Sequence, residues 1–180
     1  MEVKDRHFIL KNNKVGIIRS ATVSDVEKII NVIDKTAKET IFLSRAENEQ
    51  IPTVDEELEW IINKNKSMTN LFLICEVENE IVGTFSLNIY KKQKLKHRAM
   101  VGISILEKYW GLGIGTEFFE EGLRVAKNND VEIVELDFIE GNVKARGLYE
   151  KMGLKIIGRR PNAIKINDKY LDEYMMQKVL

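Results

Sequence analysis

The sequence is poor in cysteine and lacks long apolar runs. Its 180 residues contain one cysteine, Cys75, so the chain forms no internal disulfide. This cysteine lies in the apolar run LFLICEV, where we expect a buried strand residue in a reducing compartment rather than a catalytic thiol. The N-terminal MEVKDRHFIL lacks the basic segment followed by an apolar segment that is typical of a secretion signal. No apolar stretch approaches the roughly 20 residues that span a bilayer. We therefore predict a cytoplasmic protein without a membrane partner.

The sequence also lacks an excess of either charge. Its 28 Lys and Arg residues balance 28 Asp and Glu residues, which argues against nucleic acid as the principal partner. The one basic run, KKQKLKHR at 91–98, is interpreted as a solvated loop, with attraction of a phosphate-bearing ligand or acidic substrate as the alternative. Repeats, linkers and low-complexity segments are absent, so we expect a single domain over residues 1–180.

Apolar periodicity predicts an α/β chain in which strands and helices alternate. Strands that are separated by helices imply a parallel pairing where the two central units meet. The expected order is a strand at 14–21, helices at 22–40 and 53–66, a hairpin at 71–90, a strand at 98–106, a helix at 113–130, a strand at 131–139, a short helix at 142–152 and a closing hairpin at 154–180.

Two helix starts carry a capping-box signature. Ser24 with Glu27 and Thr53 with Glu56 have the spacing at which a hydroxyl and a carboxylate satisfy the first backbone N–H groups of a helix. Between these helices, residues 42–52 show no clear period. We interpret this stretch as either a surface loop or a substrate lid.

Three glycines stand at alternate positions in YWGLGIGT, residues 109–116, between an expected strand and an expected helix. The first N–H groups of a helix lack internal partners and its dipole favours negative charge there, so this junction predicts an anion site, with phosphate as the obvious candidate. Two common phosphate loops do not fit, because Thr116 stands where the dinucleotide fingerprint needs glycine and no Gly-Lys-Ser/Thr triplet occurs. Close strand–helix packing is the alternative explanation for the glycines.

A second motif follows in EGNVKARGLYEKMGL at 140–154. Together the two motifs resemble those of the GNAT superfamily of acyl-CoA-dependent N-acetyltransferases, whose loop reads Arg/Gln-x-x-Gly-x-Gly/Ala and whose next unit reads Asn-x-x-Ala-x-x-Leu-Tyr-x-Lys-x-Gly-Phe. In the loop, Trp110 replaces Arg or Gln, and Leu112 replaces a frequent Lys or Arg. The second pattern is matched by Asn142, Ala145, Leu148, Tyr149, Lys151 and Gly153, with Leu154 in place of Phe. The resemblance spans roughly 15–180 and is greatest to the ribosomal-protein-acetylase-like bacterial branch.

The resemblance implies the GNAT fold, with a mixed central sheet of about six to seven strands, helices on both faces and a splayed fourth and fifth strand. It implies acetyl-CoA as cosubstrate and no metal. The fourth strand, residues 100–106, would offer its open edge to the pantetheine arm, and the backbone N–H groups of residues 112–116 would hold the pyrophosphate. Carried over, the cofactor-binding residues are Ile103, Ile105, Trp110, Gly111, Leu112, Gly113, Ile114, Gly115, Thr116 and Asn142; Asn142 is equally a helix N-cap.

The implied activity is direct attack of a primary amine on the thioester, with Tyr149 as general acid to the leaving thiolate. A tyrosine hydroxyl, with an ordinary pKa of about 10, keeps its proton at neutral pH and can give it to a thiolate. The alternative for Tyr149 is an aromatic that fills the helix–sheet interface. A rival function is a non-catalytic acyl-CoA sensor of the same fold, and the presence of Tyr149 favours the enzyme.

The sequence leaves the general base open among Glu76, Glu78, His97, Glu107 and a water chain to a distant carboxylate. The acceptor is open as well, between a small-molecule amine and a protein N-terminus. Dimerisation is common in the family, and nothing in the sequence decides it. The segments that form the acceptor side in this family supply Phe42, Glu47, Glu49, Tyr170 and Glu173, which favours an amine attracted by carboxylates.

Overall fold

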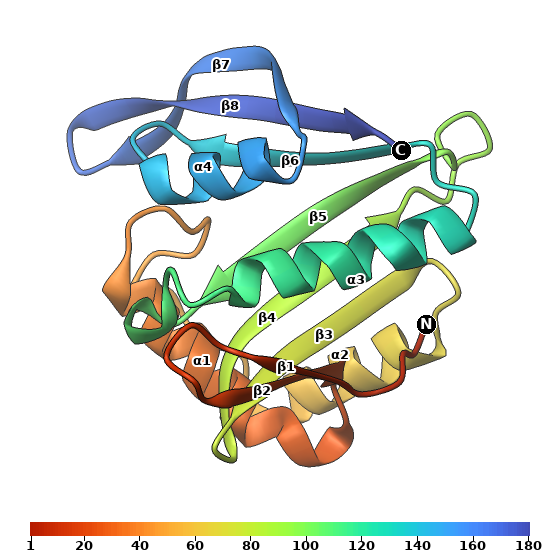
Figure 1. Cartoon of the computed structure of the whole chain (residues 1–180). Coiled ribbons are helices and arrows are strands. Elements are labelled where there is room, and N and C mark those ends of the chain that lie inside the picture. The colour runs from red at the N-terminus through yellow and green to blue at the C-terminus, as the bar shows by residue number, and fades with distance from the viewer.

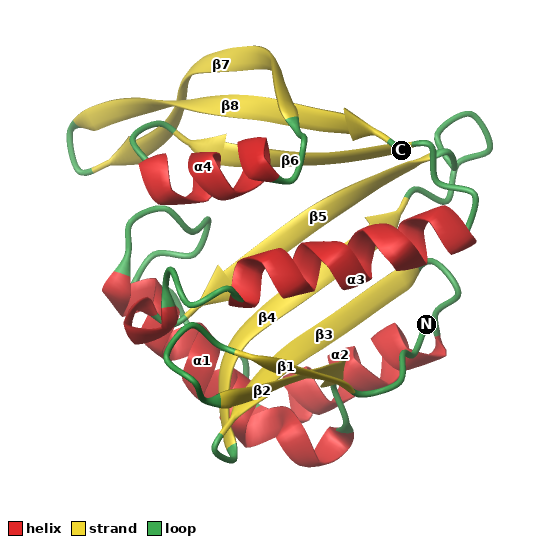
Figure 2. Ribbon diagram, in the orientation of Figure 1, coloured by secondary structure: helices red, strands yellow, loops and turns green.

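A computed structural model describes all residues from Met1 to Leu180 and shows one sheet covered by helices (Figure 2). The strands are β1 (Arg6–Ile9), β2 (Val15–Ser20), β3 (Asn70–Val77), β4 (Glu80–Ile89), β5 (Arg98–Ile105), β6 (Ile133–Ile139), β7 (Lys155–Ile166) and β8 (Lys169–Val179). The helices are α1 (Val26–Glu39), α2 (Val54–Lys66), α3 (Ile114–Asn128) and α4 (Val143–Lys151), with 3-10 turns at Val23–Asp25 and Glu107–Tyr109. None of the helices is long and apolar enough to cross a membrane.

The strand order is β1-β2-β3-β4-β5-β6-β8-β7, and every pairing is antiparallel except β5 with β6. The parallel ladder is short, because it runs only from the pair Arg98–Ile133 to the pair Met100–Glu135. Beyond it the two strands separate, while β5 stays paired with β4 as far as Ile105 (Figure 1). The predicted mixed sheet with one splayed parallel pair is confirmed.

The two faces of the sheet carry separate apolar clusters. Helices α1 and α2 pack on one face over Phe72 and Ile74, whereas α3 packs on the other face over Leu71 and Leu73. Helix α4 lies over β6, where Tyr149 packs against Phe138. Successive side chains of a strand point to opposite faces, so the unbroken apolar run in β3 is what a strand covered on both sides requires. The helix α3 lies so close to β4 that a Cβ on Gly122 would stand 2.5 Å from the ring of Phe85.

Two local predictions were wrong. The sheet has eight strands, because the short β1, RHFI, adds an edge strand that four residues of mixed polarity do not signal. The first capping box is formed by Thr22 and Asp25 rather than by Ser24 and Glu27, since a 3-10 turn precedes α1. The second capping box, Thr53 with Glu56, lies where it was predicted.

Candidate active site

The edge of β5 is open where β6 has turned away. The Leu106 N–H donates to the Val82 carbonyl of β4 at 2.9 Å. Because peptide groups alternate in direction along a strand, those of Ile103 and Ile105 point away from β4 and toward the open side. The Ile105 carbonyl accepts a hydrogen bond from the Trp110 indole Nε1 at 2.6 Å. The N–H and carbonyl groups of Ile103 and the N–H group of Ile105 are therefore left for a bound chain to pair with.

The glycine loop next to this edge presents a run of free donors. Gly111 and Gly113 have φ angles of 75° and 103°, which residues other than glycine rarely adopt. None of the five consecutive N–H groups from Gly111 to Gly115 donates a hydrogen bond within the chain, whereas the Thr116 N–H donates to the Gly113 carbonyl at 3.0 Å. The free donors thus begin and end one residue earlier than the predicted run 112–116.

A cleft of about 1040 Å³ joins the open edge, the glycine loop and α4. Leu112 alone among the predicted cofactor residues does not line it. The Leu112 side chain instead packs against the core, and its carbonyl accepts a hydrogen bond from the Lys11 N–H at 3.2 Å. The others, which do line the cleft, are Ile103, Ile105, Trp110, Gly111, Gly113, Ile114, Gly115, Thr116 and Asn142.

Positive charge reaches the cleft from outside the loop. Lys11, Lys144 and Lys151 line it. The Lys151 ammonium donates to the Thr116 hydroxyl at 3.0 Å, and the Lys144 ammonium lies 4.6 Å from the centre of the Trp110 ring. Lysines of α4 and of the segment before β2 therefore supply positive charge to the cleft, although residue 112 is a leucine. No single sequence motif contains all three lysines.

Tyr149 lies on α4 with its ring between Phe119 and Phe138, at centroid distances of 5.7 and 6.0 Å. It is 7% exposed and lines the cleft, and its hydroxyl makes no hydrogen bond within the chain. Burial raises the pKa of Tyr149 to about 12. The hydroxyl therefore stays protonated at every physiological pH and is free to donate into the cleft.

Asn142 serves as the N-cap of α4, because its side-chain oxygen accepts from the Ala145 N–H at 3.2 Å. The structural role that the sequence suggested for this residue is therefore present. Asn142 also lines the cleft, and a cofactor contact from it stays a prediction.

None of the predicted candidate bases lines the cleft. Glu76 is held by Arg19 at 2.6 Å, and Glu78 lies in the β3–β4 turn, paired with Lys14 at 2.6 Å. Glu107 is exposed in the turn after β5. His97 precedes β5, at the end of that strand opposite to the glycine loop.

Two other carboxylates do line the cleft. Asp137 of β6 and Glu173 of β8 both form ion pairs with Arg160 of β7, the first at 2.8 Å. Sequence reasoning missed Asp137, because a single acid within an apolar strand gives no signal of its partners. Glu173 and Phe42, two of the residues expected on the acceptor side, line the cleft, whereas Glu47, Glu49 and Tyr170 do not.

The sequence profile described as the acetyltransferase (GNAT) family matches residues 34–154, which is more than half of the chain. The chain belongs to this family. The prediction of a GNAT N-acetyltransferase is thereby confirmed, and the matched region contains the glycine loop, the open edge of β5 and Tyr149.

Individual proteins named as acetyltransferases resemble most of the chain. An N-alpha-acetyltransferase of Sulfurisphaera tokodaii is 29% identical over 154 residues, which cover 81% of this chain and 83% of that protein. The crystal structure of a ribosomal-protein-alanine N-acetyltransferase from Brucella melitensis superposes with a TM-score of 0.80 at 22% identity, covering 91% of this chain and 99% of the other. The protein yncA of Salmonella typhimurium, solved with its cofactor acetyl-CoA, has a TM-score of 0.80 at 15% identity and covers 91% of this chain and 93% of its own.

Proposed function

We propose that this GNAT enzyme transfers an acetyl group from acetyl-CoA to a primary amine by direct attack, with Tyr149 as general acid. The observation that carries the proposal is one cleft lined by four of the five residues with free N–H groups in the glycine loop, Gly111, Gly113, Ile114 and Gly115, by the open edge of β5 and by Tyr149 with its free hydroxyl. These are the groups that a pyrophosphate, a pantetheine amide and a leaving thiolate respectively require.

The cofactor-binding part of the proposal rests on charge and backbone direction. The N–H groups at the start of α3 and the positive end of its dipole favour the pyrophosphate. The lysines of the cleft add positive charge beside them. The Ile103 peptide group offers the pantetheine arm one donor and one acceptor, as a neighbouring strand would.

The chemical part rests on the Tyr149 hydroxyl and on the carboxylates of Asp137 and Glu173, which line the cleft. The amine nitrogen bonds to the thioester carbonyl carbon, the carbon–sulfur bond breaks, and the Tyr149 hydroxyl protonates the departing thiolate. The amine gives up its proton to the carboxylate pair Asp137 and Glu173, directly or through water, and this proton later restores Tyr149. The same pair attracts the acceptor while it is still an ammonium ion, which first releases one proton to solvent and so becomes the neutral amine that attacks.

Protein N-termini are the acceptor class that the relatives favour, since the Sulfurisphaera tokodaii protein is an N-alpha-acetyltransferase. The test is release of the CoA thiol from acetyl-CoA in the presence of peptides with free N-termini and of a panel of small amines. We expect acetylation of at least one peptide class and identify the product by mass spectrometry. Binding of acetyl-CoA without turnover of any acceptor would contradict catalysis and favour the sensor.

Replacing Lys151 with glutamine is expected to weaken acetyl-CoA binding roughly five- to tenfold at low salt, about 1 kcal/mol, because one cation beside the phosphate site is lost. The loss should shrink as salt rises, since screening already weakens this interaction in the wild type. Isothermal titration at two salt concentrations measures both effects. Lys155→Gln, at an exposed residue outside the cleft, is the matched control, and an equal loss in both variants would contradict a local role for Lys151.

A further inference from the structure

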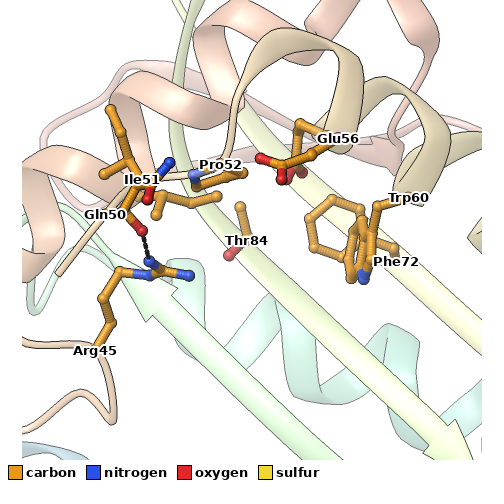
Figure 3. Close-up of a pocket in the computed structure, with 10 residues that line it drawn as sticks. Arg45, Gln50, Ile51, Pro52, Glu56, Trp60, Phe72 and Thr84 are labelled. Atoms are coloured by element: carbon orange, nitrogen blue, oxygen red, sulfur yellow. Dashed lines mark hydrogen bonds between the residues drawn. The ribbon is translucent and has the colours of Figure 1, made fainter.

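A second cavity of about 640 Å³ lies beneath the segment that joins α1 to α2 (Figure 3). Its walls come from α1, from that segment, from the first turns of α2 and from β3 and β4. Ile33, Ile51, Trp60 and Phe72 form its apolar lining, and the Trp60 ring meets Phe72 edge to face at 4.7 Å. A hollow of this size and polarity suits a small organic molecule.

Glu57 places a carboxylate without a partner in this cavity. The residue is 6% exposed and lines the hollow. Its carboxylate makes no hydrogen bond and no ion pair, and burial raises its pKa with only partial opposition from the charge of Arg45. A largely buried charge without a hydrogen-bond or ion-pair partner is costly, and within the chain only the charge of Arg45 offsets this cost, in part.

The other charged groups of the lining are already engaged. The Arg45 guanidinium donates to the Gln50 carbonyl, as the dashed line in Figure 3 marks. Glu56 accepts from the N–H and hydroxyl of Thr53 in the capping box. With one arginine against two glutamates the lining carries an excess of one negative charge, and Glu57 is the carboxylate that remains for a ligand.

We propose that this cavity binds an organic cation, an ammonium or guanidinium group on an apolar stem, with Glu57 as its counter-ion. The apolar walls receive the stem. Trp60 acts as such a wall rather than as a cation–π partner, because the Lys64 ammonium already lies 4.9 Å from its ring centre. The site goes beyond the proposed function, since none of its lining residues lines the acetyl-CoA cleft.

The cavity nevertheless adjoins the cleft. Thr84 lines the cavity and stands directly opposite Ser104, which lines the cleft, in the ladder between β4 and β5. Residues directly opposite one another share a face of the sheet and lie about 5 Å apart. The cation can therefore come from two sources: the far end of the acceptor amine, or a separate small molecule.

Pentylamine, a cation at neutral pH, and the neutral alcohol pentanol of the same shape are the probes for binding to the complete protein by isothermal titration. We expect pentylamine to bind the wild type and to bind Glu57→Gln at least tenfold more weakly, while pentanol does not distinguish the two. Glu59→Gln, which removes an exposed charge from the same helix outside the cavity, should behave as wild type. Equal affinity of pentylamine for wild type and Glu57→Gln, or no binding to the folded wild type, would overturn the proposal.

The melting temperature supplies an independent readout. Without a ligand, Glu57→Gln should melt roughly 2–4 °C higher than wild type, because it removes a largely buried charge that has no hydrogen-bond or ion-pair partner. Glu59→Gln should leave the melting temperature unchanged. A lower melting temperature for both Glu57→Gln and Arg45→Gln would show instead that the two residues stabilise each other, which overturns the ligand assignment.

The source of the cation is decided by kinetics, and this arm alone rests on the proposed function. Cadaverine, the diamine with the same five-carbon stem, is compared with pentylamine as acceptor. If the acceptor supplies the cation, Glu57→Gln should raise the KM for cadaverine at least tenfold and leave the KM for pentylamine unchanged. If a separate molecule supplies it, both KM values stay unchanged while pentylamine binding is still lost in Glu57→Gln. Failure of acetyl transfer would contradict the proposed function and would leave the binding result standing.

Discussion

Replacing Gly113 with valine is expected to weaken acetyl-CoA binding at least a hundredfold. Gly113 is the N-cap of α3 at φ 103° and ψ −15°, where a β-branched residue is strongly disfavoured. A change in this backbone angle would turn the N–H groups of Gly113, Ile114 and Gly115 out of line with one another. Loss of two hydrogen bonds to a charged phosphate costs about 3 kcal/mol or more, which corresponds to about a hundredfold in affinity.

Two observations separate this effect from unfolding. Backbone strain at one residue costs about 1–3 kcal/mol, which is less than the about 5–15 kcal/mol that stabilises an ordinary domain, so circular dichroism should show Gly113→Val folded. Gly113→Asn tests whether acetyl-CoA needs the open space beside this residue. Asparagine adopts positive φ more readily than valine, and a Cβ at this residue meets nothing within 4 Å, so the side chain fills only space that the cofactor would occupy. We expect this variant to fold as wild type and still to bind acetyl-CoA poorly. Wild-type affinity in folded Gly113→Val would refute the pyrophosphate site.

The sequence predicted the parts of the molecule that depend on neighbouring residues. The periodicity of apolar residues predicted the order of the helices and of the main strands. The spacing of residues within each motif predicted the positions of the glycine loop and of the helix that carries Tyr149. Edge strand β1 escaped detection because four residues with half-buried and exposed side chains in alternation resemble any surface segment.

The parts that escaped prediction depend on which elements the fold brings together. His97 was a chemically reasonable base, yet it precedes β5 while the cleft begins at Val101. A strand of eight residues separates its two ends by about 25 Å, so His97 lies far from the glycine loop at the other end of β5. The Asp137–Arg160–Glu173 group joins three strands, and its members carry no signal of one another in the sequence.

Replacing Tyr149 with phenylalanine is expected to lower kcat about a hundred- to ten-thousandfold and to leave the affinity for acetyl-CoA unchanged. The phenyl ring keeps the contacts with Phe119 and Phe138, so the fold and the cleft should persist. The variant lacks only the proton for the thiolate, and general acid catalysis contributes a rate factor of this size. Turnover of a peptide or amine identified by thiol release, together with isothermal titration of acetyl-CoA, measures both quantities.

The matched control for Tyr149→Phe is Tyr174→Phe. Tyr174 stacks on the same Phe138 ring at 5.4 Å but does not line the cleft, so its hydroxyl should be dispensable for turnover. Equal losses in both variants would indicate that packing rather than proton transfer is affected. Turnover at the wild-type rate in Tyr149→Phe would remove Tyr149 from the mechanism.

The pH profile adds a test that depends on the environment of Tyr149. The general acid must be protonated, and the protonated form prevails at pH values below the pKa. Because burial raises the pKa of Tyr149 to about 12, its ionisation should cause no fall in kcat between pH 7 and about pH 10, the ordinary tyrosine pKa. The deficit of Tyr149→Phe relative to wild type should therefore be constant across this range. A deficit that disappears toward pH 10 would show that the hydroxyl loses its proton near the ordinary pKa, and would place it in contact with solvent rather than in the buried position that the fold gives it.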